Sequence, residues 1–240
     1  MSKLRVPSLQ HMARNWCETP KLVQKKLVQL AQHPPTWGYQ ALFGAVYDML
    51  VLAVPYDQIV AGIRQKVSRE NVRENLLQVL PLIQDHFDKL HPDRVLTVSR
   101  TSFSAGKGLR IAFEPPLIYI INGEVFLPWF SFWRSNPLSG KKLSLFVTIV
   151  DEIQRQNPDL EGARLQILDF SRPSPKEERA LRVIDAADVE RLPMEEVTAM
   201  LEIFAEGYFA ALAELEAEAI AEAVRPAEKD PKQPGLFDAE

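Results

Sequence analysis

The fold is decided by residues 117–134, whose sequence is LIYIINGEVFLPWFSFWR. Two apolar runs flank Asn122-Gly123, and this dipeptide favours a two-residue hairpin because both central residues of a type I′ turn need positive φ. Pro128 interrupts the returning run and marks a sheet edge or a bulge. Aromatic residues fall on both faces of that strand, which is typical of a strand buried between helix layers. We therefore predict a β-hairpin within the core.

Further strands are expected on both sides of this hairpin. Residues 95–103 are rich in β-branched and hydroxyl side chains, Gly106-Lys107-Gly108 has the composition of a turn, and residues 109–113 alternate. Together with the hairpin they predict an antiparallel β-meander of about three strands. Residues 164–170 predict a further strand, which follows a helix that Ser139 can cap.

Residues 1–67 predict an N-terminal helical layer. Thr19-Pro20 can cap and begin a helix, since the missing N–H of proline does no harm in the first turn. Residues 37–54 are apolar almost all round, which predicts a central, buried helix. The helical pattern continues over residues 68–90, with a kink expected at Pro81.

The C-terminal end changes character twice. Residues 193–224 predict a long helix rich in Ala and Glu, and from residue 225 onward Pro and charge dominate without periodicity, which is typical of disorder. The predicted fold class is therefore α+β, in three regions. These are a helical region at 1–67, an α+β core with the C-terminal helix at 68–224, and a disordered tail with a linear motif at 225–240.

The composition indicates a cytoplasmic protein. Cys17 is the single cysteine, so no intramolecular disulfide can form. The N-terminus has no apolar signal core, and the most apolar stretch, 41–54, is too short to span a bilayer. No membrane association is therefore expected.

The net charge of −4 conceals an asymmetry along the chain. The body up to residue 192 is mildly basic, and the remainder is strongly acidic. A basic body permits a nucleic-acid surface without requiring one.

The sequence contains no pattern of a catalytic or cofactor site. It has neither a Gly-rich phosphate loop nor a Gly-x-Ser-x-Gly elbow. Asp85, Asp88 and His91 can share a helix face and hold a divalent ion, but we favour a solvated helix end, because a histidine is favourable there anyway and the set has no recognised ligand pattern. We predict no catalytic residue, no metal and no cofactor, and favour a protein that is not an enzyme.

The order of elements after residue 68 resembles the αβββαβ core of PD-(D/E)XK nucleases. That family needs an acid on one strand and an acid-x-Lys on the next, to hold Mg²⁺ and activate water. Here Glu114 and Glu124 stand near those places, but Phe126 occupies the position of the lysine. The resemblance therefore implies a degenerate nuclease, or one with a relocated site that uses Glu114, Glu124 or Asp169.

The aromatic run at 126–133 has a second interpretation. Its rings can form a stacking surface for unpaired bases, with basic residues as phosphate contacts. The possible nucleic-acid contacts are Arg100, Arg110, Arg134, Lys141 and Lys142. A buried strand remains the simpler explanation, because stacking surfaces interleave basic residues with rings and this run has none before Arg134.

The tail contains Gln233-Pro234-Gly235-Leu236-Phe237. This stretch resembles the peptide with which bacterial replication and repair proteins bind the β sliding clamp, whose pattern is Gln-Leu-(Ser/Asp)-Leu-Phe. Gln233, Leu236 and Phe237 match the characteristic positions, whereas Pro234 and Gly235 depart from the pattern. The resemblance implies that the leucine and phenylalanine enter a hydrophobic pocket on the clamp.

These observations give one leading hypothesis and two alternatives. The leading one is a non-enzymatic accessory protein of bacterial DNA replication, DNA repair or mobile-element biology, tethered to the β sliding clamp by its tail. Its body would contact DNA or another protein. The alternatives are the degenerate nuclease and a plain protein-interaction module.

Overall fold

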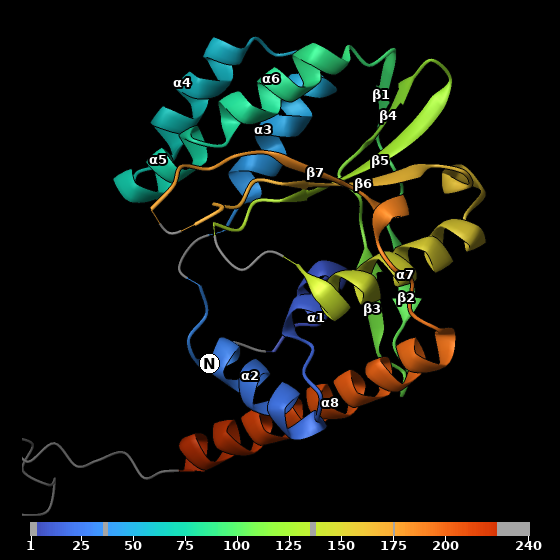
Figure 1. Cartoon of the computed structure of the whole chain (residues 1–240). Helices are drawn as coiled ribbons and strands as arrows, with labels where there is room; N and C mark the ends of the chain where they lie inside the picture. The colour runs from blue at the N-terminus through green and yellow to red at the C-terminus, as the bar shows by residue number, and fades with distance from the viewer. Residues whose placement is uncertain (1–3, 36–37, 135–137, 175, 225–240) are drawn as a thin grey trace, which may run out of the picture.

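Figure 1 shows the computed structural model of the protein, which describes residues 4–35, 38–134, 138–174 and 176–224. The helices in chain order are α1 (Leu9–Asn15), α2 (Pro20–Gln32), α3 (Gln40–Leu50), α4 (Tyr56–Lys66), α5 (Glu70–Leu77), α6 (Leu80–Leu90), α7 (Gly140–Gln156) and α8 (Met194–Val224). The strands are β1 (Arg94–Leu96), β2 (Thr101–Ser104), β3 (Arg110–Phe113), β4 (Ile118–Ile121), β5 (Glu124–Ser131), β6 (Arg164–Asp169) and β7 (Arg182–Asp185).

A five-stranded mixed sheet divides the molecule into layers. Its order is β1-β4-β5-β6-β7, in which β5 and β6 are parallel and the other neighbours antiparallel. Helices α3 to α6 cover one face, while α1, α2, α7, α8 and the small sheet β2–β3 cover the other (Figure 1). This arrangement, with its long C-terminal helix, confirms the predicted α+β class.

The predicted hairpin joins β4 to β5 in the middle of the sheet. Its two turn residues, Asn122 and Gly123, adopt φ values of 51° and 80°. Alternate side chains of β5 then enter two separate hydrophobic clusters, and the whole stretch 126–133 is buried. The cluster beneath α3–α6 contains Phe126, Phe130 and Phe132, and the opposite cluster contains Leu127, Trp129 and Trp133. The buried-strand interpretation of the aromatic run is confirmed.

The predicted single meander is wrong in its connectivity. The turn at Gly106-Lys107-Gly108 does form, and it joins β2 to β3. These two strands leave the main sheet, however, because Ile111 and Phe113 are fully buried on the α1 side, where the Phe113 ring stacks 5.4 Å from Trp129. β1 pairs with β4 instead.

The predicted all-round burial of the central helix is also wrong. Leu42, Ala45 and Val46 of α3 are buried, but Phe43 and Tyr47 are 40% and 39% exposed. The helix has more apolar side chains than its packed face can cover, so these two rings stay partly exposed. The kink predicted at Pro81 is instead a break between two helices, since α5 ends at Leu77 and Pro81 lies in the first turn of α6.

Three sequence predictions concern matters beyond these elements. No helix within the described ranges is long and apolar enough to cross a membrane, and the cytoplasmic location stays a prediction. The division of the chain at residue 67 also stays a prediction. The predicted disordered tail, 225–240, lies outside the described residues.

Candidate functional site

Helix α8 leads to the C-terminal motif and is fixed to α2. Gly207 permits their close approach, because a Cβ at that position would lie 2.5 Å from the Cβ of Val23. Nearer the end of the pair, the Gln32 amide donates to the Glu218 carboxylate at 3.1 Å. The last turns of α8 therefore lie beside the C-terminal end of α2, as Figure 1 also shows.

The predicted clamp-binding residues Gln233, Leu236 and Phe237 lie outside the described residues. The chain enters their segment after Val224, at the end of α8. The described chain thus ends in a 31-residue helix that packs against α2, and the motif follows this helix in the sequence.

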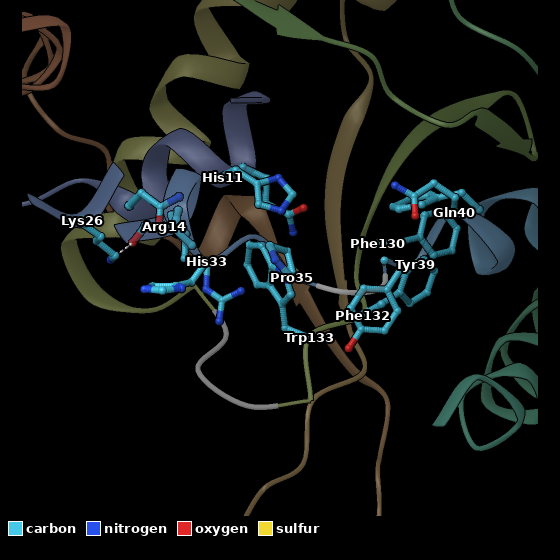
Figure 2. A pocket seen from close by; sticks show the side chains of 15 residues that line it. His11, Arg14, Lys26, His33, Pro35, Tyr39, Gln40, Phe130, Phe132 and Trp133 are labelled. Carbon is cyan, nitrogen blue, oxygen red and sulfur yellow. Dashed lines mark hydrogen bonds between the residues drawn. The ribbon is translucent and has the colours of Figure 1, made fainter. Parts of the chain in front are cut away.

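A cavity of about 910 Å³ opens between the two helix layers, close to the end of β5. Its 15 lining residues come from α1, the C-terminal half of α2 and the segment that follows it, the start of α3, and the end of β5. Figure 2 shows that basic side chains and aromatic side chains occupy opposite sides. The two sides are called here the basic wall and the aromatic wall.

The basic wall carries Arg14 of α1 and Lys26 of α2. The ammonium groups of Lys26 and of Lys142, from α7, both donate to the main-chain oxygen of Arg14, at 3.2 and 3.1 Å. Burial lowers the pKa of Lys26, and repulsion from Lys142 and Arg14 lowers it further. The Arg14 guanidinium lies 4.1 Å above the Trp133 ring.

Two histidines add to this side of the cavity. His33 follows α2, and His11 of α1 shares a 2.8 Å hydrogen bond with the Ser8 hydroxyl. Burial, followed by the charge of Arg14, lowers the pKa of His11, so its ring is neutral at pH 7.

The aromatic wall contains Tyr39 and Phe132, which Figure 2 labels, and Phe43, which lines the cavity and packs on Phe132. The Phe43 ring meets Phe132 edge to face, with centroids 5.0 Å apart, and Tyr39 lies 5.9 Å from the same ring. Phe43 keeps 40% of its surface exposed. Part of the Phe43 side chain on α3 is therefore accessible at the cavity.

A buried arginine lies behind the aromatic wall. Arg179 is 6% exposed and donates to the main-chain oxygens of Phe132 and Phe170, at 2.9 and 2.7 Å, and to Asn75 Oδ1 at 2.8 Å. It also donates to the Tyr39 hydroxyl at 3.4 Å. Burial lowers its pKa. All of these acceptors are neutral, so the guanidinium charge has no carboxylate partner in the described part of the chain.

The structure divides the predicted nucleic-acid contacts among different places. Arg100 precedes β2 and lies 3.9 Å from Glu114, Arg110 bonds the Ser102 hydroxyl, and Lys141 pairs with Glu196 at 2.5 Å. Lys142 is the member that comes close to the basic wall. The Arg134 main-chain oxygen accepts from the N–H of Arg172 next to the end of β6. Their contact with nucleic acid stays a prediction.

The three acids considered for a relocated metal site do not meet. Glu124 begins β5 and Asp169 ends the parallel strand β6, a separation of about 23 Å at the usual strand rise. Each of the three has its own arginine partner. Glu124 pairs with Arg164 at 3.4 Å, Asp169 with Arg182 at 3.0 Å, and Glu114 with Arg100 at 3.9 Å. No group of three His, Cys, Asp or Glu within the described residues can hold a metal ion. The nuclease resemblance stays a prediction without support from these positions.

Sequence reasoning singled out the aromatic run that supplies Phe130, Phe132 and Trp133, but it missed the other residues that form the cavity. Arg14 and Lys26 lie on two helices and look like ordinary surface cations, and Arg179 ends a charged loop that suggests solvent exposure. Phe43 carried the one usable signal, because α3 contains more large apolar residues than one helix face can bury.

The arrangement can bind an anion, and among the described residues no Asp or Glu lines the cavity to supply a carboxylate for acid–base chemistry. Comparison with the curated proteins gave no match. A family model described as "Sliding clamp-binding bacterial toxin SocB" matches residues 12–218. The match includes the sheet, both helix layers and most of the cavity lining, and it ends within α8. The chain therefore belongs to the SocB family of sliding clamp-binding bacterial toxins.

Proposed function

We propose that this protein is a toxin that binds the bacterial β sliding clamp through Gln233, Leu236 and Phe237 and thereby blocks the clamp's other clients. The family to which the chain belongs supports the role of a clamp-binding toxin. The tail motif supports the location of the contact, because its three characteristic residues match the clamp-binding pattern. A clamp-binding accessory role in replication or repair would use the same contact, but the family's description as toxins favours blockage.

The tail has the chemistry of a linear binding motif. Leu236 and Phe237 are large apolar residues in a polar, Pro-rich segment, and burying each in a partner's pocket contributes about 1.5–3 kcal/mol. Pro234 restricts the free peptide and so reduces the entropy lost on binding. Because a short peptide must still become ordered, an affinity of about micromolar is expected.

Competition explains how such a peptide becomes toxic. Proteins that use the same clamp pocket are excluded while the tail occupies it. The body of this chain then adds bulk next to the clamp without supplying synthesis or repair. The toxic effect should therefore rise with the ratio of this protein to the clamp clients, and should fall when clamp is overproduced.

The body of the chain is a second candidate location for the clamp contact. The matched residues, 12–218, stop before the motif, so the features that the family shares lie in the body. A clamp contact on the body would survive removal of the tail. The experiment below separates these two locations.

The test measures binding of the purified full chain to purified β clamp by surface plasmon resonance. Leu236→Ala/Phe237→Ala is compared with Lys229→Ala/Pro231→Ala, which alters the same tail outside the motif. We expect the first variant to bind at least about tenfold more weakly and to lose its inhibition of clamp-dependent DNA synthesis, while the control keeps both. Unchanged binding by the first variant would move the contact to the body. Absence of clamp binding by the parent chain would refute the proposed function.

A further inference from the structure

The cavity between the helix layers has a basic side and an aromatic side, and one class of ligand fits both. Its volume of about 910 Å³ lies in the range of small-molecule sites. Its basic wall, with Arg14 and Lys26, faces an aromatic wall in which Figure 2 labels Tyr39 and Phe132. Phe43 lines the same cavity and packs on Phe132. A ligand that fills it should have an anionic end and a flat, apolar end.

The positive charge near the cavity is not neutralised within the described residues. None of their ion pairs includes Arg14, Lys26 or Lys142, although the two lysines converge on one main-chain oxygen. Behind the opposite wall, Arg179 is buried among neutral acceptors. Grouping like charges in a partly buried place is unfavourable unless an anion joins them, since charges interact more strongly away from water.

The aromatic wall decides which anion fits. Trp133 cannot offer its face freely, because Arg14 lies 4.1 Å over the ring and the edge of His11 meets it at 5.5 Å. Phe43 differs, since it is 40% exposed and contacts Phe132 in an edge-to-face pair. A flat ring can therefore lie against Phe43 while an attached anion reaches the basic wall. Inorganic phosphate alone would leave that aromatic surface uncovered.

We propose that this cavity binds a nucleotide, with its phosphate at Arg14 and Lys26 and its base against Tyr39 and Phe43. The nucleotide can be free in solution or can be an unpaired unit of a single strand, because both present the same phosphate and base. The site is independent of the clamp contact. Charge-assisted hydrogen bonds hold the phosphate, and stacking on aromatic rings holds the base with little preference for its identity.

The test uses the purified full chain and isothermal titration calorimetry with dAMP, deoxyadenosine, inorganic phosphate and a 12-residue oligothymidylate. Lys26→Gln is compared with Lys25→Gln, its exposed neighbour on α2, and Phe43→Ala with Tyr47→Ala, an equally exposed ring on α3. We expect Lys26→Gln to weaken nucleotide binding about tenfold or more and Phe43→Ala at least about fivefold, with both controls near the parent. Binding should weaken as salt is raised.

The pattern of probes identifies the source of the nucleotide. Binding of dAMP with little gain from the oligonucleotide indicates a free nucleotide, and much tighter binding of the oligonucleotide indicates a single strand. Deoxyadenosine binding as well as dAMP, or equal losses in Lys26→Gln and Lys25→Gln, would overturn the proposal. Absence of binding by both dAMP and the oligonucleotide at millimolar concentration would also overturn it.

The tail peptide is the competing occupant. The chain leaves α8 near the end of α2, and residues after α2 line the cavity. A Gln233–Glu240 peptide that binds the parent but not Phe43→Ala, with no nucleotide binding, would assign the cavity to the tail and overturn the nucleotide proposal.

Discussion

Replacing Arg179 by Met tests how the aromatic wall is held in place. Its guanidinium joins the ends of β5 and β6 to α5 through the main-chain oxygens of Phe132 and Phe170 and the amide of Asn75. These three bonds are 2.7–2.9 Å long and are made by a charged donor in a buried place. Each contributes about 1 kcal/mol net, and the acceptors left behind lose their partner.

The expected cost is therefore about 3 kcal/mol of unfolding free energy, reduced somewhat because the desolvation penalty of a buried, unpaired charge disappears. Arg179→Lys should cost less, since an ammonium keeps the charge and three donors but cannot reproduce the planar fork. Urea unfolding followed by tryptophan fluorescence at pH 7 measures both changes.

The control is Arg155→Met, which removes an exposed arginine paired with Glu152 on α7 and should change stability by less than about 0.5 kcal/mol. An Arg179→Met variant as stable as that control would refute the reasoning, because it would mean that the buried bonds only compensate for the burial of the charge.

Two further predictions concern the helix pair and the sheet. Gly207→Ala should lower the free energy of unfolding, measured by urea denaturation, by about 1–3 kcal/mol, because its Cβ would lie 2.5 Å from the Cβ of Val23. Gly62→Ala in α4 is the control: its Cβ meets nothing within 4 Å, so it should be neutral or stabilising. Equal effects of the two substitutions would contradict the tight α2–α8 packing. Burial raises the pKa of Tyr119 to about 12, so the tyrosine's contribution to stability is complete below pH 10 and is lost as pH rises toward 12. The parent should therefore lose stability relative to Tyr119→Phe over that interval, and parallel pH profiles would show that the hydroxyl titrates normally.

The hairpin was predictable because its determinants are local. Asn122 and Gly123 accept positive φ. Aromatic residues on both faces of β5 indicate that both faces are buried. The partner of each strand was less predictable. β2 and β3 have ordinary strand composition, and their departure from the main sheet depends on Phe113 stacking against Trp129, a contact between distant parts of the fold.

The cavity could not be predicted for a similar reason. Each cation of the basic wall has a normal helical context, and only the packing of α1 and α2 beside β5 brings Arg14 and Lys26 together. Arg179 follows a Pro-containing, charged segment whose composition indicates a surface loop, yet tertiary structure buries it against strand ends. Local composition indicates the average environment of a segment. Whether a single charged side chain within it is buried depends on contacts with elements distant in sequence.

The cavity and the tail motif belong to different parts of the chain, so the body and the tail can each contribute to blockage of the clamp. The cavity lies almost wholly within the residues that the family shares, whereas the tail motif lies beyond them. A short peptide of about micromolar affinity dissociates quickly, so blockage by the tail alone would be brief. A body that also holds a single strand next to the clamp would raise the effective concentration of the tail and lengthen its residence there.

If the oligonucleotide proves to be the preferred ligand, Lys26→Gln should therefore reduce inhibition of clamp-dependent synthesis while leaving binding to the isolated clamp unchanged. If dAMP binds as well as the oligonucleotide, Lys26→Gln should leave both unchanged, since a free nucleotide tethers nothing.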